Sequence, residues 1–300
     1  MEQNKIITAD RRFRKLEELN LIDNFLFQEM LSQEEGKEFT RILLSTILDK
    51  NIRKVKIIPQ KNILGVDTDR HGIRLDAYIE DLSDEQGKGI ADAEVIPDIY
   101  DIEPNNTYEK GALPRRMRYY HGLIDTQILA SGLDYEKLPN VVIIIILPYD
   151  PFGRNRMVYT IKNGCVEDPT LDYDDGAKKI FLYTKGKEGK PSQKLMDMLK
   201  YIEKTTDNNV VNQDIASIQE LVNRVKRKKE VNISYMKSWE IEKMVRTEGY
   251  DEGRNDGYSE GQDKINLLVM KLNDAGRLAD IVKAAGDKAY QESLFKEFGL

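Results

Sequence analysis

Apolar residues recur every three to four positions between residues 11 and 50, and every second position in residues 53–60 and 73–80. The first spacing predicts amphipathic helices, and the second predicts half-buried strands. A third strand is expected over residues 98–104, where Pro104 belongs at a strand end or edge because it has no N–H to donate. In the 73–80 strand, four apolar residues are expected to share one face: Ile73, Leu75, Ala77 and Ile79.

Residues 82–95 are rich in glycine and acidic side chains and are expected to form a loop. After it, five apolar residues fall within about a third of a helical wheel: Leu113, Met117, Tyr120, Ile124 and Ile128. Residues 141–147 form an unbroken apolar run, which is typical of a strand buried on both faces. A strand–helix–strand crossover normally makes a parallel pair. We therefore expect an α/β fold with a mixed central sheet and helices on both faces.

The second half of the chain is expected to be mostly helical. Two shorter strands are predicted around residues 157–161 and 179–183, and helices from Pro191 onward. From Thr247, glycine recurs every four residues, at Gly249, Gly253, Gly257 and Gly261. We expect four segments: an N-terminal extension (1–20), an α/β domain (21–190), a helical region (191–247), and a tail (248–300) in which two or three short amphipathic helices follow the glycine repeat.

Composition excludes several functional classes. The 300 residues include 46 basic and 52 acidic side chains, a net charge of −6, so any nucleic-acid surface must be local. Cys165 is the single cysteine, which rules out a disulfide framework, and two histidines are too few for a histidine metal cage. The longest apolar run is far shorter than the roughly 20 residues of a membrane helix, and no apolar leader opens the chain. A cytoplasmic location is expected.

Charge is distributed unevenly around the third predicted strand. Residues 67–109 hold thirteen acidic and three basic side chains, whereas residues 110–120 hold four basic and none acidic. An acidic segment beside a basic helix start suits a divalent cation held next to a phosphate. Asp76 and Glu103 lie on neighbouring predicted strands, so both carboxylates could meet at one Mg²⁺. The alternative is that both are ordinary polar-face residues of a half-solvated sheet.

Two basic clusters are candidates for phosphate contacts. In the helix that begins near Ala112, Arg115, Arg118 and Tyr119 point away from the apolar face and Arg116 flanks it. Arginines beside a helix N-terminus can hold phosphate oxygens, but they can equally form a solvated helix face. The run RVKRKK at residues 224–229 leaves the same two alternatives open.

Four blocks, in order, carry a family resemblance: IRLDAYIED, IYDIEPNN, GALPRRMRYYHGLID and LPNVVIIIILPYDPFG. Over roughly residues 20–185 the chain resembles the PD-(D/E)XK nuclease superfamily, and more narrowly the bacterial recombination-promoting nuclease / putative transposase family; the glycine-repeat tail is similar as well. The resemblance implies an αβββαβ restriction-endonuclease-like core and a Mg²⁺-dependent DNA endonuclease, with Mn²⁺ as an alternative ion.

The resemblance also assigns site residues. Asp76 and Glu103 match the two acidic positions, and Pro104 is the variable position, whose carbonyl oxygen can still coordinate a metal. Asn105 stands where the superfamily has lysine and this family more often has glutamine. Asparagine can orient a water molecule but brings no charge, and Lys110 is a candidate for the missing cation. Asn24 is a second departure, because many relatives have aspartate there.

The implied mechanism has a metal held by Asp76, Glu103 and the Pro104 carbonyl, while Asn105 orients the attacking water. Three arginines would grip backbone phosphates: Arg115, Arg116 and Arg118. Tyr119 is a candidate for stacking on a base, whereas the neighbouring Tyr120 is expected to pack in the core.

Two other hypotheses follow from the residues. The departures at Asn24 and Asn105 suit a DNA-binding or scaffold protein that no longer cuts. The four tail glycines cost a helix roughly 1 kcal/mol each relative to alanine. Close packing against a partner helix would offset that cost and make the tail a homo-oligomer contact; a frayed linker is the alternative.

Overall fold

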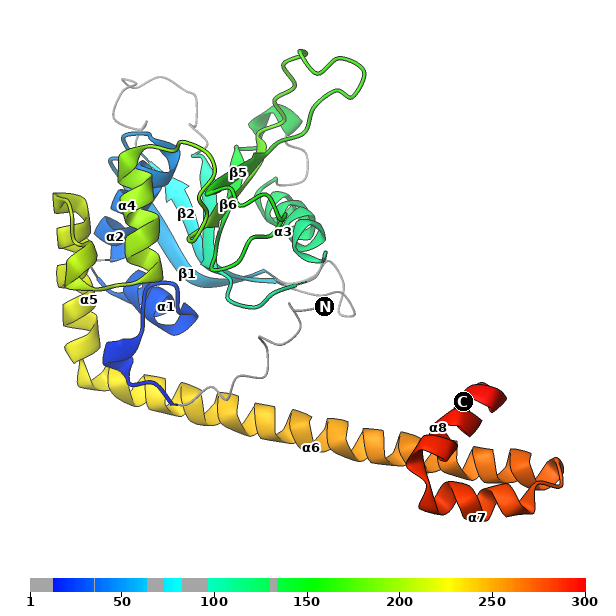
Figure 1. Cartoon of the computed structure of the whole chain (residues 1–300). Helices are drawn as coiled ribbons and strands as arrows, with labels where there is room; N and C mark the ends of the chain where they lie inside the picture. Colours follow the sequence, from blue (N-terminus) through cyan, green and yellow to red (C-terminus); the bar gives the residue numbers. More distant parts are fainter. Residues whose placement is uncertain (1–12, 35, 64–72, 83–96, 110, 130–133) are drawn as a thin grey trace. The chain divides into compact units, whose positions relative to one another are not determined.

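The computed structural model describes residues 13–34, 36–63, 73–82, 97–109, 111–129 and 134–300 (Figure 1). The expected loop at 82–95 lies almost wholly outside the described residues, as does Lys110. The chain forms two compact units, Met1–Tyr235 and Met236–Leu300. The first is an α/β unit and the second is helical.

A six-stranded mixed sheet forms the centre of the first unit, in the order β1-β2-β3-β4-β6-β5. The strands are β1 (Val55–Ile63), β2 (Ile73–Asp81), β3 (Ile99–Pro104), β4 (Val141–Leu147), β5 (Val158–Ile161) and β6 (Ala177–Tyr183). Strands β1, β2 and β3 are antiparallel neighbours, β3, β4 and β6 are parallel, and β5 returns antiparallel to β6. The predicted mixed sheet and the parallel crossover are confirmed.

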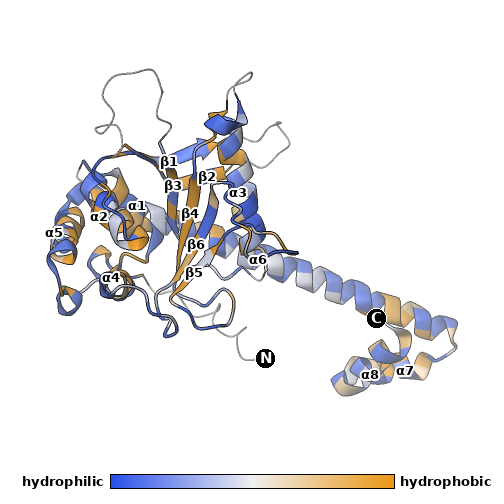
Figure 2. Ribbon diagram, turned by 90° about the horizontal axis from the view of Figure 1, so that it is seen from above, coloured by the Kyte–Doolittle hydropathy of each residue, from blue (hydrophilic) through white to orange (hydrophobic). Residues whose placement is uncertain are grey.

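Helices cover both faces of this sheet (Figures 1 and 2). One face carries α1 (Asn24–Ser32), α2 (Gly36–Leu48), α4 (Gln193–Glu203) and α5 (Gln213–Arg227), and the other carries α3 (Leu113–Ile128). Alternate residues of β4 enter the two core clusters, since Ile144 belongs to one and Ile143 to the other. This strand is therefore buried on both faces, as its sequence predicts.

Gly36 is required where α1 gives way to α2. A Cβ atom at Gly36 would lie 2.6 Å from the carbonyl oxygen of Leu31, far closer than a carbon and an oxygen can approach. The two helices can therefore follow one another this closely only with glycine at the start of α2.

The prediction that four apolar residues of β2 share one face is wrong. Leu75 packs in the core cluster under α3, whereas Ala77 packs in the cluster under α1 and α2. The change from one face of the sheet to the other occurs at Asp76. The neighbouring strand has Gln60 at the matching place, with a left-handed backbone (φ 52°) between the Pro59–Ala77 and Lys61–Leu75 pairs. The left-handed residue interrupts the pleat of β1 at the position where β2 changes the face on which its apolar residues lie.

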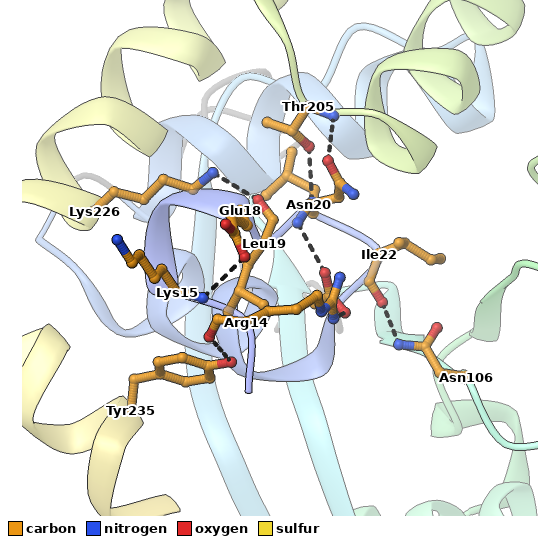
Figure 3. Close-up of polar contacts among 12 residues, drawn as sticks. Arg14, Lys15, Glu18, Leu19, Asn20, Ile22, Asn106, Thr205, Lys226 and Tyr235 are labelled. Atoms are coloured by element: carbon orange, nitrogen blue, oxygen red, sulfur yellow. Dashed lines mark hydrogen bonds and ion pairs between the residues drawn. The ribbon is translucent and has the colours of Figure 1, made fainter. Parts of the chain in front are cut away.

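A segment before α1 ties the helical layer to the sheet domain. The Leu21 N–H donates to Thr205 Oγ1 at 2.8 Å, and the Tyr235 hydroxyl donates to the Arg14 carbonyl oxygen at 2.9 Å (Figure 3). At the other end of the segment, Asn106 Nδ2 donates to the Ile22 carbonyl oxygen at 2.8 Å (Figure 3). Helices α4 and α5 thus belong to the same unit as the sheet.

One C-terminal helix, α6, is longer than the sequence pattern predicts, whereas the two helices after it are short, as expected. Helix α6 runs from Lys229 to Asp274 and is followed by α7 (Leu278–Gly286) and α8 (Lys288–Phe298). All four repeat glycines lie inside α6, and α6 continues past the repeat to Asp274, where we expected the first of the short helices to begin. A small core of Leu268, Leu272, Ala284 and Leu294 joins the last turns of α6 to α7 and α8. Among the described residues, no helix is long and apolar enough to cross a membrane.

Candidate active site

Asp76 on β2 and Glu103 on β3 lie on neighbouring strands of the sheet. The pairing of these strands ends at Tyr78 and Asp101, and Asp76 and Glu103 each lie two residues beyond that pair along their strands. Their charges interact, because the charge of Asp76 contributes to raising the pKa of Glu103.

Asp101 is a third carboxylate of this site, and we did not select it from the sequence. It is completely buried, and the backbone of Ala77 and the charge of Arg116 favour its charged form. Burial raises its pKa well above the ordinary value, and the charges of Glu103 and Asp76 raise it further. The signal was present in the alternation of β3, because Ile99, Asp101 and Glu103 fall on one face.

Arg116 of α3 supplies the positive charge next to these carboxylates. Its Nη2 donates to Glu103 Oε1 at 2.8 Å, and its Nη1 forms a short contact with Glu109. Burial raises the pKa of Glu103 to about 7, while the charge of Arg116 lowers it. In this arrangement Arg116 bridges two carboxylates, whereas the sequence analysis expected it to hold a phosphate.

Asn105 sits in the loop that leaves β3. It is buried, its Nδ2 donates to Glu109 Oε1 at 3.2 Å, and its Oδ1 accepts from the Thr107 N–H at 2.9 Å. Pro104, the last residue of β3, pairs with Ile146 at the end of β4. The side chain of Asn105 therefore holds the loop beside Glu109 and Arg116.

Two glutamines complete the surroundings of Asp76, and the sequence analysis missed both. Gln28 of α1 donates from Nε2 to Asp76 Oδ1 at 2.8 Å, and Gln60 Nε2 donates to Gln28 Oε1 at 3.1 Å. Burial raises the pKa of Asp76, and the hydrogen bond from Gln28 lowers it. Gln28 lies one helical turn after the exposed Asn24, and that spacing could have suggested it.

The remaining predicted contacts lie along α3. Arg115, Arg118 and Tyr119 are exposed, and Arg116 is half-buried. Tyr120 packs against the core cluster under α3, which confirms the packing interpretation for that residue. The exposed side chains of α3 therefore present two guanidinium groups and one aromatic ring to solvent.

The carboxylate cluster fits a hard divalent cation by its chemistry. Mg²⁺ prefers carboxylate and carbonyl oxygens, which Asp76, Glu103 and Pro104 can provide. Among the described residues, no three histidine, cysteine, aspartate or glutamate side chains already stand in a geometry that could hold a metal ion. Binding would therefore require side-chain adjustment.

Comparison of the chain with protein-family models, with curated proteins and with solved structures found no match.

Proposed function

We propose that this protein is a metal-dependent DNA endonuclease, which hydrolyses phosphodiester bonds in the cytoplasm. The observation that carries the proposal is that Asp76 and Glu103 lie on the neighbouring strands β2 and β3 and their charges interact, with the arginines of α3 following β3 in the chain. The order of α2, three strands, α3 and β4 supports an αβββαβ restriction-endonuclease-like core of the kind that the family resemblance implies. The resemblance further suggests a role in transposition or recombination.

Mg²⁺ or Mn²⁺ held by Asp76, Glu103 and the Pro104 carbonyl oxygen would supply a bound water of lowered pKa and neutralise charge on the scissile phosphate. The chain's own residues have separate roles. Gln28 fixes the orientation of Asp76 through its 2.8 Å hydrogen bond. Asn105 donates to Glu109, which also contacts Arg116, and is the candidate for orienting water.

The exposed arginines of α3 are suited to hold the DNA backbone. Arg115 and Arg118 extend from the polar side of this helix, and neither has a partner among the described residues. Guanidinium groups bind phosphate through paired hydrogen bonds without reading the base sequence. Binding through them is expected to weaken steeply as salt rises.

Cleavage of supercoiled plasmid DNA in Mg²⁺ or Mn²⁺ tests the proposal. Asp76→Asn and Glu103→Gln should each lower the rate about a hundredfold or more, because metal activation supplies several kcal/mol. Glu80→Gln is the matched control, since Glu80 lies on the same strand but pairs with Lys56 at 3.0 Å near the surface. Cleavage that survives both site substitutions would rule out this site.

A second candidate is a DNA-binding or scaffold protein that no longer cuts. It is favoured by the ion pair of Arg116 with Glu103, because a guanidinium already occupies one side of the expected metal ligand. Calorimetric titration with Mg²⁺, together with DNA binding in a chelator, separates the two functions. A scaffold should bind DNA equally well without the cation and release no heat on metal addition.

A further inference from the structure

A basic pocket lies away from the carboxylates, in the helical layer of the first unit. It has a volume of about 740 Å³ and lies among η5 (Asp207–Asn209), α5 and the first residues of α6. Four consecutive basic residues line it, at positions 226–229, against two acidic ones, Glu17 and Asp207. In a chain with a net charge of −6, this is a local concentration of positive charge inside a concavity.

Two of the four basic side chains build the pocket wall. Lys226 Nζ donates to the carbonyl oxygen of Leu19 at 2.6 Å (Figure 3) and to that of Glu17 at 2.9 Å. Lys228 donates to the side-chain carbonyl of Gln33. These hydrogen bonds go to neutral oxygens, so both ammonium charges contribute to the field in the pocket.

The other two basic side chains are free to bind a ligand. Arg227 and Lys229 are exposed, and neither has a hydrogen bond or ion pair within the part of the chain that the structure describes. They stand on either side of Lys228, where α5 ends and α6 begins. A solvated helix face would not combine this charge with a concavity.

Hydrogen bonds fix the orientation of two side-chain amides in the same pocket. The Tyr201 hydroxyl donates to Gln219 Oε1 at 2.6 Å, and Gln219 Nε2 donates to Asn223 Oδ1 at 3.0 Å. This chain leaves the Asn223 Nδ2 group as a donor, and Asn232 lines the pocket as well. Such groups suit the oxygen and nitrogen acceptors of a sugar or base.

We propose that this pocket binds the phosphate groups of a nucleotide, either free or within a DNA strand. Arg227 and Lys229 hold the phosphate oxygens, and the ordered carboxamides contact the nucleoside part. No metal ion and no residue of the candidate active site takes part, so the pocket is independent of cleavage. Binding of a nucleotide within a DNA strand rests on the proposed function, whereas binding of a free nucleotide does not.

The test measures binding of ATP and of a short fluorescent DNA duplex to the full chain in EDTA, with Asp76→Asn in every protein so that cleavage cannot interfere. The double variant Arg227→Gln/Lys229→Gln should weaken binding about tenfold or more, because two charge-assisted contacts are lost. The control Lys187→Gln/Lys200→Gln removes two exposed charges of the same unit outside the pocket and should bind as before. The exchange Arg227→Lys/Lys229→Arg keeps both charges and should retain most of the affinity.

The binding results for ATP and for DNA lead to different conclusions. Loss of ATP binding in the double variant identifies a free-nucleotide site, and loss of DNA binding alone identifies a strand contact. The proposal is overturned if neither ligand binds the parent protein, or if the pocket variant and the surface control behave alike. A plasmid-cleavage result of either sign leaves this conclusion unchanged.

Discussion

Arg116 on α3 and Glu103 on β3 form an ion pair across the sheet–helix interface, with Nη2 and Oε1 2.8 Å apart. The Glu103 side chain is 8% exposed and the Arg116 side chain 28% exposed, so the pair is largely shielded from water. This contact ties the position of α3 to the acidic end of β3. The positive charge of Arg116 also offsets part of the negative charge of Glu103 at the candidate metal site.

Replacing Arg116 by glutamine should destabilise the fold by about 2 kcal/mol, because Glu103 and Glu109 lose their shared counter-charge. Urea unfolding measures the change. Arg115→Gln is the control, since the exposed Arg115 precedes it and should leave the midpoint unchanged. The double variant Arg116→Gln/Glu103→Gln should recover part of the loss. If Arg116→Gln unfolds at the same urea concentration as the parent, the ion pair has no structural role.

The same substitution should strengthen Mg²⁺ binding, because a competing cation leaves the site. Titration calorimetry of the parent and of Arg116→Gln compares the two affinities directly. Weaker binding in the variant would mean that Arg116 positions Glu103 for the metal rather than competing with it.

Gln28 is expected to act as a positioning residue for Asp76. Gln28→Ala removes the 2.8 Å hydrogen bond and leaves Gln60 without its acceptor, so Mg²⁺ affinity should fall roughly tenfold. Gln28→Glu should do the opposite, because it adds a carboxylate beside Asp76. Calorimetry on the two variants should therefore give shifts of opposite sign, and shifts of the same sign would contradict this role.

His121 makes the stability of the fold depend on pH. It is buried on α3, its Nε2 donates to the Lys178 carbonyl oxygen at 3.2 Å, and its Nδ1 has no hydrogen-bond partner within the described part of the chain. Burial, followed by the charge of Lys179, lowers the pKa of His121 to about 4. The unfolded chain, with a pKa of about 6.5, then binds the proton more readily than the folded one.

His121 should therefore cost nothing above about pH 6.5 and up to about 3 kcal/mol once the pH falls to about 4. The buried carboxylates act in the opposite direction, so the useful quantity is the difference between the parent and His121→Gln. The variant should gain stability relative to the parent as the pH falls through this range. A constant difference from pH 7 to pH 4 would be evidence against a buried neutral imidazole.

The glycines of α6 provide a test of assembly through the tail. A Cβ atom at Gly249, Gly253, Gly257 or Gly261 meets nothing within 4 Å in the chain itself. Within one chain, each alanine should therefore stabilise α6 by roughly 1 kcal/mol. If a second copy packs on this face, the four alanines should instead weaken the oligomer.

Light scattering compares the full chain, the four-alanine variant and residues 1–245. A mass that falls on truncation and on substitution supports a homo-oligomer. Identical monomeric masses in all three would exclude assembly through the tail.

The type of most elements in the first unit follows from local periodicity. The 141–147 run predicts a strand buried on both faces, and the apolar stripe of α3 identifies its core side. The predictions that failed also concern single positions or segments. The alternation of apolar residues in β2 fails at Asp76. The left-handed residue opposite it, Gln60, lies on β1, and the pattern of β2 alone gives no sign of it. Likewise, the glycine repeat does not predict that α6 is continuous from Lys229 to Asp274.

The sequence by itself determined that Asp76 and Glu103 lie on neighbouring strands of a mixed sheet, because period-two patterns and a parallel crossover depend only on nearby residues. The tertiary structure alone decided three further relationships: the burial of Asp101 between them, the reach of Gln28 from α1 to Asp76, and the engagement of Arg116 by Glu103. Each of these depends on strand register or helix packing between distant segments. Periodicity shows which face a residue occupies, but it carries no information about which residue lies opposite.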